Sequence, residues 1–458
     1  MSKKLYIKTW GCQMNVYDSK RMADALFPLG YEVSEEPHNA DMIILNTCHI
    51  REKATDKVFS ELGRLKEHKD NKESMILAVA GCVAQAEGDY IFERAPYVDM
   101  VFGPQNYHEL PEMVAKATGA FGTNRIINTE FPLESKFDFL PEETTQQSAS
   151  SFLSVQEGCD KFCTYCVVPY TRGSEFSRPV SSVLEEAKRL ASLGTKEITL
   201  LGQNVNAYHG EAKDSSIWGL GRLIQEVAEI DGIERIRYTT SHPNDMDDEL
   251  IAAHGNVEKL MPYLHLPVQH GSDKILKSMN RKHTADDYRR VIDKVRNVRP
   301  DIALSSDFIV GFPGEKDEDH EAMLQIIRDI GYSQCYSFKY SPRPGTPGAN
   351  MGGVVAEPIK AARLQEVQEL LNKQQIEFNQ KFIGKILPVL FDRIGDKRKQ
   401  LLGRTPYMQS IHIDGNKRLL NQTVDVKIEK AHANSVSGSI VTSETVLTNN
   451  NKEERTAA

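Results

Sequence analysis

The sequence predicts an α/β protein of three parts: an N-terminal doubly wound α/β domain, a central partial (β/α)6 barrel and a small C-terminal β-barrel. Three observations lead to this prediction. Short apolar runs alternate with helical patterns in residues 1–115 and again after residue 151, and short alternating strands with turns fill residues 385–441. The 458 residues also suffice for several domains, because domains commonly have about 100–200 residues each.

Residues 3–120 form the first predicted domain. Apolar runs at 5–9, 42–46 and 75–80 have the length of buried parallel strands, and helical spacing is found at 19–29, 54–66 and 89–95. This alternation is typical of an open sheet with helices on both faces. Residues 121–144 lack periodicity, and we predict that they are a linker.

Residues 145–375 form the predicted barrel, in which strands alternate with amphipathic helices. Six units are too few for a complete eight-unit barrel, so we expect a partial, curved one. The strands are predicted at 152–156, 197–201, 235–239, 263–268, 302–310 and 333–340, and helices at 183–192, 218–230, 287–298 and 318–330.

A long helix at 356–382 leads into the last predicted domain, residues 376–442, and overlaps its start. Short alternating strands with turns at 394–397 and 414–416 predict a small all-β barrel there. Residues 443–458 are polar, and we expect them to be disordered.

Composition predicts a cytoplasmic protein without membrane association, which we expect to act as a monomer. Apolar residues make up 40% of the chain and charged residues 26%, which is ordinary for soluble proteins. The apolar runs have the length of strands and fall far short of the roughly 20 residues that span a bilayer. The basic N-terminus leads straight into a charged strand, without the apolar core of a signal peptide.

The charge distribution points to a polyanionic partner at the C-terminal end. The net charge is −8, yet residues 376–445 carry 11 Lys and Arg against 7 Asp and Glu. The tail therefore offers candidate contacts to phosphates or stacked bases, although a solvated loop would explain each residue taken singly. The candidates are Lys397, Arg398, Lys399, Arg404 and Tyr407.

Three of the seven cysteines are clustered, at Cys159, Cys163 and Cys166, directly after the first barrel strand. This spacing lets three thiolates converge on one inorganic centre, and cysteine runs of this kind hold iron–sulfur clusters. A structural zinc ion would require four ligands, and no fourth Cys or His lies within ten residues on either side. An iron–sulfur cluster is therefore favoured, while zinc completed by a distant histidine remains an alternative.

Three dispersed cysteines, Cys12, Cys48 and Cys82, each stand immediately after a predicted strand of the first domain. The carboxyl ends of parallel strands share one edge of a sheet, where ligands bind. Three thiols at that edge could meet around a second cluster. Burial in the core is the more common fate of a free cysteine, but three in the same topological position favour the cluster. Cys335 lies in an apolar strand, and we expect a buried structural thiol.

With Tyr165 before its last cysteine, the clustered run resembles the CxxxCxφC hallmark of the radical S-adenosylmethionine superfamily. The resemblance implies a [4Fe–4S] cluster with one iron open to S-adenosylmethionine, which one electron cleaves to a 5′-deoxyadenosyl radical. An external donor such as a flavodoxin or ferredoxin would supply the electron. The implied cofactor contacts are Tyr165, Gly202, Gln203, Asn204, Ser241, Gln269, Val310 and Gly311, each of which turn chemistry alone could explain.

Further motifs resemble the methylthiotransferase family within that superfamily. They are TWGCQMN at 9–15, NTC at 46–48, GC at 81–82, VVPYTRG at 167–173, HLPVQ at 265–269 and MNR at 279–281. The basic tail resembles a TRAM domain, a small RNA-binding barrel, and the resemblance extends over about residues 3–441. It implies two [4Fe–4S] clusters, the second held by Cys12, Cys48 and Cys82 as an auxiliary cluster.

Residues 11–15, GCQMN, resemble the branch of this family that modifies isopentenylated adenosine in tRNA. The branch that modifies an aspartate of a ribosomal protein typically has GCPKN there, and the branch that modifies threonylcarbamoyladenosine in tRNA has GCKVN. One departure is Gln269-His270, where the first branch often has Gln-Ser. Both other branches, and a non-catalytic zinc-containing RNA-binding protein, remain alternatives.

The implied reaction is methylthiolation of C2 of N6-(dimethylallyl)adenosine at position 37 of tRNA, with two molecules of S-adenosylmethionine. One would supply the methyl group and the other the radical. This adenosine lies in the anticodon loop, where single-stranded bases can be splayed out and read.

Overall fold

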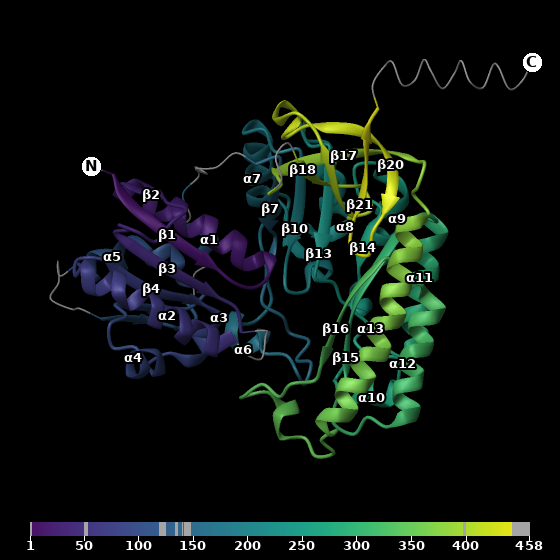
Figure 1. Ribbon diagram of the computed structural model, residues 1–458, viewed down its shortest axis with the longest axis horizontal. Helices are drawn as coiled ribbons and strands as arrows, with labels where there is room; N and C mark the ends of the chain where they lie inside the picture. Colours follow the sequence, from purple (N-terminus) through teal and green to yellow (C-terminus); the bar gives the residue numbers. More distant parts are fainter. Residues whose placement is uncertain are drawn as a thin grey trace, which may run out of the picture.

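The computed structural model describes residues 2–49, 54–118, 125–132, 136–139, 141, 148–396 and 400–441. Figure 1 shows an N-terminal α/β part, a central strand-and-helix part and a small C-terminal barrel packed on the central part. The α/β class and its three predicted parts are therefore confirmed. Among the described helices, none combines the length and the apolar composition needed to cross a membrane.

The N-terminal part is a six-stranded parallel sheet in the order β2-β1-β3-β4-β5-β6. The order reverses between β1 and β3, and ligands of such sheets bind at the carboxyl ends of the strands at that point. The strands are β1 Lys3–Thr9, β2 Tyr31–Val33, β3 Met42–Thr47, β4 Ile76–Gly81, β5 Met100–Phe102 and β6 Ile126–Asn128.

Helices cover both faces of this sheet, as a doubly wound domain requires. Every residue of β3 and β4 is buried, so their continuous apolar runs need helices on both sides. On one face lie α1 Gln13–Leu26 and α5 Leu110–Ala117, and on the other α2 Ala54–Asn71, α3 Cys82–Glu87 and α4 Tyr90–Arg94.

Two details of this region differ from the sequence prediction. The first helix begins at Gln13, directly after Cys12, and not at residue 19. The predicted linker 121–144 contains β6, which extends the sheet beside β5, and a helical turn, η3 Lys136–Asp138. The linker prediction is therefore wrong for these described residues. A three-residue strand is too short to show a hydrophobic period, so the sequence pattern could not reveal it.

The central part contains the six predicted parallel strands. They form two three-stranded sheets, β13-β10-β7 and β14-β15-β16, and a parallel bridge between Ile236 and Leu260 connects β13 to the segment before β14. Spatial order therefore follows chain order, as in a partial barrel. The strands are β7 Ser150–Ser154, β10 Glu197–Leu201, β13 Arg235–Thr239, β14 Tyr263–His265, β15 Ala303–Val310 and β16 Gln334–Lys339.

Helices cover the outside of the partial barrel, and most of their apolar faces share one hydrophobic core with the strands. The predicted helices are all present, and α9 and the short α10 lie between strands where no helix was predicted. The helices are α7 Val180–Ser192, α8 Leu220–Ala228, α9 Asp248–Asn256, α10 Asp273–Ser278, α11 Ala285–Val298, α12 Asp317–Ile330 and α13 Glu357–Gln380. Figure 1 shows α11, α12 and α13 side by side along one edge.

The C-terminal part is a closed five-stranded barrel in the order β17-β18-β19-β21-β20, as predicted. Its apolar residues form a separate small core. It is fixed to the central barrel by Arg235, whose guanidinium donates to Pro388 O at 2.7 Å and to Arg404 O at 3.1 Å. The strands are β17 Ile386–Ile394, β18 Gln400–Arg404, β19 Ser410–Asp414, β20 Thr423–Ala431 and β21 Val436–Ile440.

Candidate metal centres at the domain interface

The three dispersed cysteines come together at one edge of the N-terminal sheet. Cys12 lies between β1 and α1, Cys48 directly follows β3, and Cys82 opens α3 directly after β4. Because β1, β3 and β4 are adjacent and parallel, their carboxyl ends place the three thiols together. The Cys12 and Cys48 side chains are hydrogen-bonded to each other, and Cys12 and Cys82 influence each other electrostatically. We call these residues the N-terminal triad.

A glycine allows the first two thiols to approach each other. Gly11 has φ +130°, a conformation that L side chains rarely adopt. A Cβ at this position would lie 2.2 Å from Cβ of Cys48 and 2.8 Å from Oδ1 of Asn15. Any other residue at position 11 would therefore push the segment of Cys12 away from Cys48.

The thiols of the N-terminal triad do not share one pKa. The pKa of Cys12 is lowered to about 6 by the hydrogen bond with Cys48, by the charge of Arg172 and by backbone N–H groups of Met14 and Asn15, although burial opposes this. Burial raises the pKa of Cys82, against the charge and hydrogen bond of Arg172. Cys12 therefore ionises more readily than Cys82.

The clustered cysteines form a second convergent set in the loop after β8 Gln156–Glu157, here called the radical triad. Cys166 N donates to Cys163 O at 2.9 Å, which folds the loop back on itself. Burial, together with the neighbouring Cys163, raises the pKa of Cys159 to about 11 and that of Cys166 to about 12. Cys163 therefore influences both other thiols, and a cluster held by all three stays a prediction.

Two glutamines hold the loop of the radical triad. Gly158 has φ +71°, and a Cβ there would lie 1.9 Å from Ser174 O, so the loop needs glycine before Cys159. Gly158 N donates to Oε1 of Gln203 at 2.6 Å, and Nε2 of Gln156 donates to Gly158 O at 2.8 Å. Gln203, predicted as a cofactor contact, therefore binds the loop that carries the cysteines.

Two predicted cofactor residues carry polar atoms that are buried and have no hydrogen-bond partner among the described residues. These atoms are Oδ1 of Asn204 and Oγ of Ser241, at the carboxyl ends of β10 and β13. Nδ2 of Asn204 donates to Asp245 at 2.9 Å, and Asp245 pairs with Lys161 in the cysteine loop at 2.7 Å. Buried polar groups are usually paired, so these two atoms fit a bound polar ligand.

The other predicted cofactor residues lie at the same end of the barrel. Tyr165 packs against an apolar group formed by Ile275, Met279, Phe312 and Tyr340. At the remaining positions the backbone conformation, or the lack of a large side chain, matters more than a functional side-chain group. They are Gly202, where a Cβ would meet Oε1 of Gln156 at 2.4 Å, Gln269 with φ +73°, the fully buried Val310, and Gly311, whose N donates to Glu315 at 2.7 Å.

One buried guanidinium accompanies each triad, and sequence reasoning missed both. Arg172, at the end of α6 Val168–Arg172, acts on Cys82, because its positive charge opposes the rise that burial produces in the pKa of that thiol. Nη1 of Arg281 lies 3.7 Å from Sγ of Cys163. Both arginines belong to motifs of the family resemblance, but a motif in the chain cannot reveal which distant thiol its arginine contacts.

The donor sets fit iron–sulfur clusters. All six cysteines are free thiols, three at each site, with a guanidinium to balance thiolate charge. Within the described part of the chain, no three His, Cys, Asp or Glu side chains are arranged to hold a single metal ion. The choice between an iron–sulfur cluster and zinc at these sites therefore stays a prediction.

The predicted RNA contacts have a mixed outcome. Lys397, Arg398 and Lys399 lie outside the described residues. Arg404 donates to Ser410 and to Met408 O, and Tyr407 packs on Phe382 with ring centroids 4.6 Å apart. The Tyr407 hydroxyl also donates to Asp301 of the central barrel at 2.9 Å. Both side chains thus have intramolecular roles, and their contact with RNA stays a prediction.

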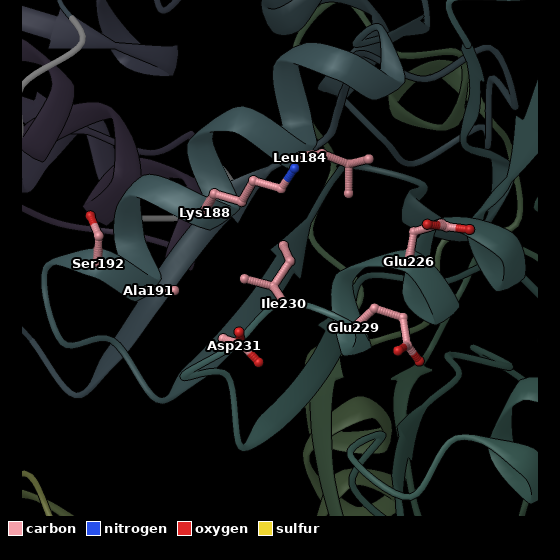
Figure 2. A pocket seen from close by; sticks show the side chains of 8 residues that line it. All are labelled: Leu184, Lys188, Ala191, Ser192, Glu226, Glu229, Ile230 and Asp231. Carbon is pink, nitrogen blue, oxygen red and sulfur yellow. The ribbon is translucent and has the colours of Figure 1, made fainter.

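A hollow of about 530 Å³ lies on the outside of the central barrel (Figure 2). The residues that line it are Leu184, Lys188, Ala191, Ser192, Glu226, Glu229, Ile230 and Asp231. They lie in or after α7 and α8, whose carboxyl ends lead towards the starts of the following strands, opposite the cysteines. Three carboxylates against one lysine also make this hollow unsuited to a polyanion.

Comparisons with known proteins agree with the three parts. Residues 4–103 match the model of the uncharacterized protein family UPF0004, residues 153–327 that of the radical SAM superfamily, and residues 380–441 that of the TRAM domain. The chain also resembles the solved structure of the radical S-adenosylmethionine methyltransferase TsrM from Kitasatospora setae, with a TM-score of 0.57. That likeness covers 76% of this chain and 74% of the other at 14% identity, and it concerns the fold.

The fold and the cysteine loop thus define a radical S-adenosylmethionine enzyme, a class that uses S-adenosylmethionine and a [4Fe–4S] cluster. Over 96% of its length the chain is 58% identical to proteins named tRNA-2-methylthio-N(6)-dimethylallyladenosine synthase from Maricaulis maris and Rickettsia felis. It covers 97% and 100% of these relatives. The chain belongs to the family of tRNA-2-methylthio-N(6)-dimethylallyladenosine synthases.

Proposed function

We propose that this protein attaches a methylthio group to C2 of N6-(dimethylallyl)adenosine at position 37 of tRNA. The observation that carries the proposal is the pair of convergent cysteine triads within a chain of this family. In this proposal the radical triad holds the [4Fe–4S] cluster that binds S-adenosylmethionine, and the N-terminal triad holds the auxiliary [4Fe–4S] cluster. The bound clusters supply, respectively, reductive cleavage of S-adenosylmethionine and a site for the sulfur that is transferred.

The residues of the chain bind and orient. Asn204 and Ser241 offer the polar atoms that lack described partners to the amino and carboxylate groups of S-adenosylmethionine. Gln156 and Gln203 hold the loop of the radical triad, and Arg281 keeps a positive charge beside Cys163. Met14 and Tyr17 of the N-terminal domain pack with Leu201 of the barrel in one buried apolar group, which holds the two domains together.

The C-terminal barrel holds the tRNA in this proposal. The region from residue 376 to 445 carries the surplus of Lys and Arg, which suits phosphate contacts, and TRAM is the family whose model matches it. Arg235 and Arg237 fix this barrel to the strands that also present the cofactor residues. We further propose that the protein is a cytoplasmic monomer that receives electrons from a flavodoxin- or ferredoxin-type donor.

Anaerobic turnover tests the proposal directly. Reconstituted protein is incubated with S-adenosylmethionine, a reductant and tRNA that contains N6-(dimethylallyl)adenosine but no methylthio group, and the nucleosides are analysed by mass spectrometry. We expect the methylthio derivative of this nucleoside and 5′-deoxyadenosine. Methylthiolation of threonylcarbamoyladenosine, or of an aspartate in ribosomal protein, with the dimethylallyl nucleoside unchanged would contradict the proposal.

A further inference from the structure

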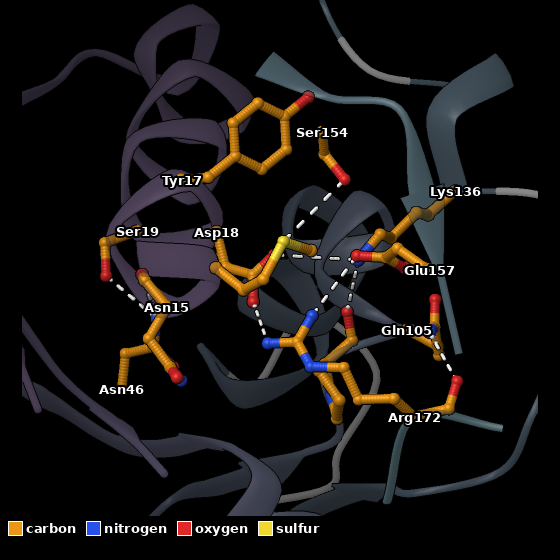
Figure 3. A network of polar contacts seen from close by, with 12 residues as sticks. Asn15, Tyr17, Asp18, Ser19, Asn46, Gln105, Lys136, Ser154, Glu157 and Arg172 are labelled. Atoms are coloured by element: carbon orange, nitrogen blue, oxygen red, sulfur yellow. Dashed lines mark hydrogen bonds and ion pairs between the residues drawn. The ribbon is translucent and has the colours of Figure 1, made fainter. Parts of the chain in front are cut away.

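Four buried charges meet where the N-terminal domain packs against the barrel (Figure 3). They are Asp18 on α1, Lys136 in η3, Glu157 in β8 and Arg172 on α6, and at most 3% of each side chain is exposed. Two positive and two negative charges alternate, so the group is neutral. We call these four residues the charge ring.

The distances close the ring. Nη2 of Arg172 lies 2.6 Å from Oδ2 of Asp18, and Nη1 lies 3.2 Å from Oε1 of Glu157. Nζ of Lys136 lies 2.7 Å from the same Glu157 oxygen and 3.6 Å from Oδ1 of Asp18. Desolvating four charges is costly, and such networks are a weak source of stability. They can instead fix the relative position of the segments that carry them.

Each segment joined by Arg172 carries a cluster ligand. Glu157 precedes Cys159 of the radical triad by two residues, and Asp18 lies on the helix that begins directly after Cys12. The charge of Arg172 also acts on Cys82, whose pKa it lowers against the effect of burial. One side chain thus pairs with the carboxylates next to both triads and places a positive charge near a ligand of the N-terminal triad.

Arg172 retains its charge in this environment. An arginine guanidinium stays protonated in proteins, and here its two arms pair with carboxylates, Asp18 at 2.6 Å and Glu157 at 3.2 Å. A fixed positive charge beside a cluster stabilises the thiolate ligands and the more negative, reduced state of the cluster. Hydrogen bonds and charges next to cluster sulfurs are known to set reduction potentials.

We propose that Arg172 is a positioning residue that holds the N-terminal cluster in a fixed relation to the radical cluster and keeps a positive charge beside its Cys82 ligand. The inference rests on the proposed function, in which both triads carry clusters. Sulfur transfer between two cofactors depends on their separation, because a misplacement of about 1 Å can cost about 100-fold in rate.

The test uses a background that retains only the N-terminal triad, Cys159→Ala/Cys163→Ala/Cys166→Ala. In this background we compare Arg172→Lys, Arg172→Gln and Asp18→Asn/Arg172→Gln after anaerobic reconstitution. In the double variant only Lys136 and Glu157 remain charged, and they pair with each other. No unpaired charge is left buried, so we expect this variant to fold. Iron affinity, sulfide content and the midpoint potential from electron paramagnetic resonance are measured, with the thermal midpoint as a check on folding.

Arg178→Gln is the matched control. Arg178 is also buried at this interface and pairs with Glu186 at 2.8 Å, and none of its described polar contacts is to a cysteine. We expect Arg178→Gln to lower the thermal midpoint without changing the potential. Arg172→Gln and the double variant should lower the potential and weaken iron binding by about 10- to 100-fold, as loss of a ligand's hydrogen-bond partner typically does. Arg172→Lys keeps the charge but cannot pair with two carboxylates at once. Its potential and iron affinity should therefore lie between those of Arg172→Gln and those of the background.

Two results would overturn the inference in different ways. A folded double variant with the potential and iron affinity of its background would show that Arg172 does not act on the cluster, and the proposed function would stand. A background protein that binds no iron and sulfide would remove the N-terminal cluster itself, and both the inference and the proposed function would fall.

Discussion

Arg172 and Asp18 are 154 residues apart in the chain, yet Nη2 of one lies 2.6 Å from Oδ2 of the other in a fully buried ion pair. The pair joins α6 of the central barrel to α1 of the N-terminal domain (Figure 3). Both helices follow cysteines, since α6 comes shortly after Cys166 and α1 directly after Cys12. The ion pair therefore connects the two segments that carry the triads.

The close approach of Gly11 to Cys48 predicts that Gly11→Ala removes the N-terminal cluster. The added Cβ would meet Cβ of Cys48 at 2.2 Å and separate two ligands. Gly30→Ala is the control, because Gly30 also has a positive φ, +80°, but a methyl group added there would meet no atom within 4 Å. We expect about half the iron and sulfide of the wild type in Gly11→Ala and full loading in Gly30→Ala. Full loading of Gly11→Ala would mean that the two ligands tolerate separation.

The unequal thiol pKa values predict selective alkylation of the cluster-free protein. With a pKa of about 6, Cys12 is mostly thiolate near neutral pH, and its reactivity should be lost as the pH falls through about 6. Cys159 and Cys166, with pKa values of about 11 and 12, are protonated there and should react only as the pH rises towards these values. Iodoacetamide followed by peptide mass spectrometry measures this. Equal labelling of the three at neutral pH would contradict the prediction.

The same pKa shifts predict opposite contributions to the stability of the cluster-free fold. A lowered pKa at Cys12 stabilises the fold above the ordinary thiol pKa, and this contribution is lost as the pH falls through about 6. Raised pKa values at Cys159 and Cys166 stabilise the fold below the ordinary thiol pKa, and that contribution is lost as the pH rises through about 11 to 12.

The buried Oγ of Ser241 predicts a variant that affects the ligand more than the fold. Because Oγ has no described hydrogen-bond partner, Ser241→Ala should leave the thermal midpoint unchanged. If S-adenosylmethionine pairs with Oγ, its affinity should fall by about 1 kcal/mol, or about five-fold. Ser306→Ala is the converse control, since Ser306 is buried and its Oγ accepts from Val268 N at 3.0 Å. It should lower stability and leave the affinity unchanged. Isothermal titration and thermal melts separate the two.

Charge on the C-terminal barrel predicts the salt dependence of tRNA binding. Lys417→Gln/Arg418→Gln removes two exposed positive charges from the turn η7 Lys417–Leu419. Each lost phosphate contact should lower the slope of log affinity against log salt by about 1. Arg289→Gln/Arg290→Gln is the control, because these α11 arginines pair with Asp286, Asp329 and Asp287. Identical slopes for the wild type and the η7 variant would exclude that turn from the tRNA contact.

Much of this architecture is predictable from the chain. The apolar runs before Cys12, Cys48 and Cys82 are long enough to identify β1, β3 and β4, and the parallel-sheet rule then brings their thiols to one edge. The six barrel strands have the same clear signal. The three-residue strands β2, β5 and β6 do not, because three residues are too few to show a hydrophobic pattern.

Tertiary contacts that no local pattern encodes account for the remainder. Arg172 and Arg281 are motif residues whose thiol partners, Cys82 and Cys163, lie far away in the chain. Tyr407 has the composition of an RNA contact, and only the packed structure shows that its hydroxyl reaches Asp301 of the barrel. Charge and aromatic composition therefore predict an RNA-binding surface. They do not show which of its side chains already bind other parts of the protein.

The central claim is that the two triads do different chemical work, and paired product analysis tests it most directly. Cys48→Ala and Cys163→Ala are each reconstituted anaerobically and incubated with S-adenosylmethionine, a reductant and the substrate tRNA, and both 5′-deoxyadenosine and the modified nucleoside are quantified in the same reactions. We predict that Cys163→Ala forms neither product, and that Cys48→Ala forms 5′-deoxyadenosine but no methylthio nucleoside. Methylthio nucleoside from Cys48→Ala at the wild-type rate would contradict the account, because the N-terminal triad would then be structural only.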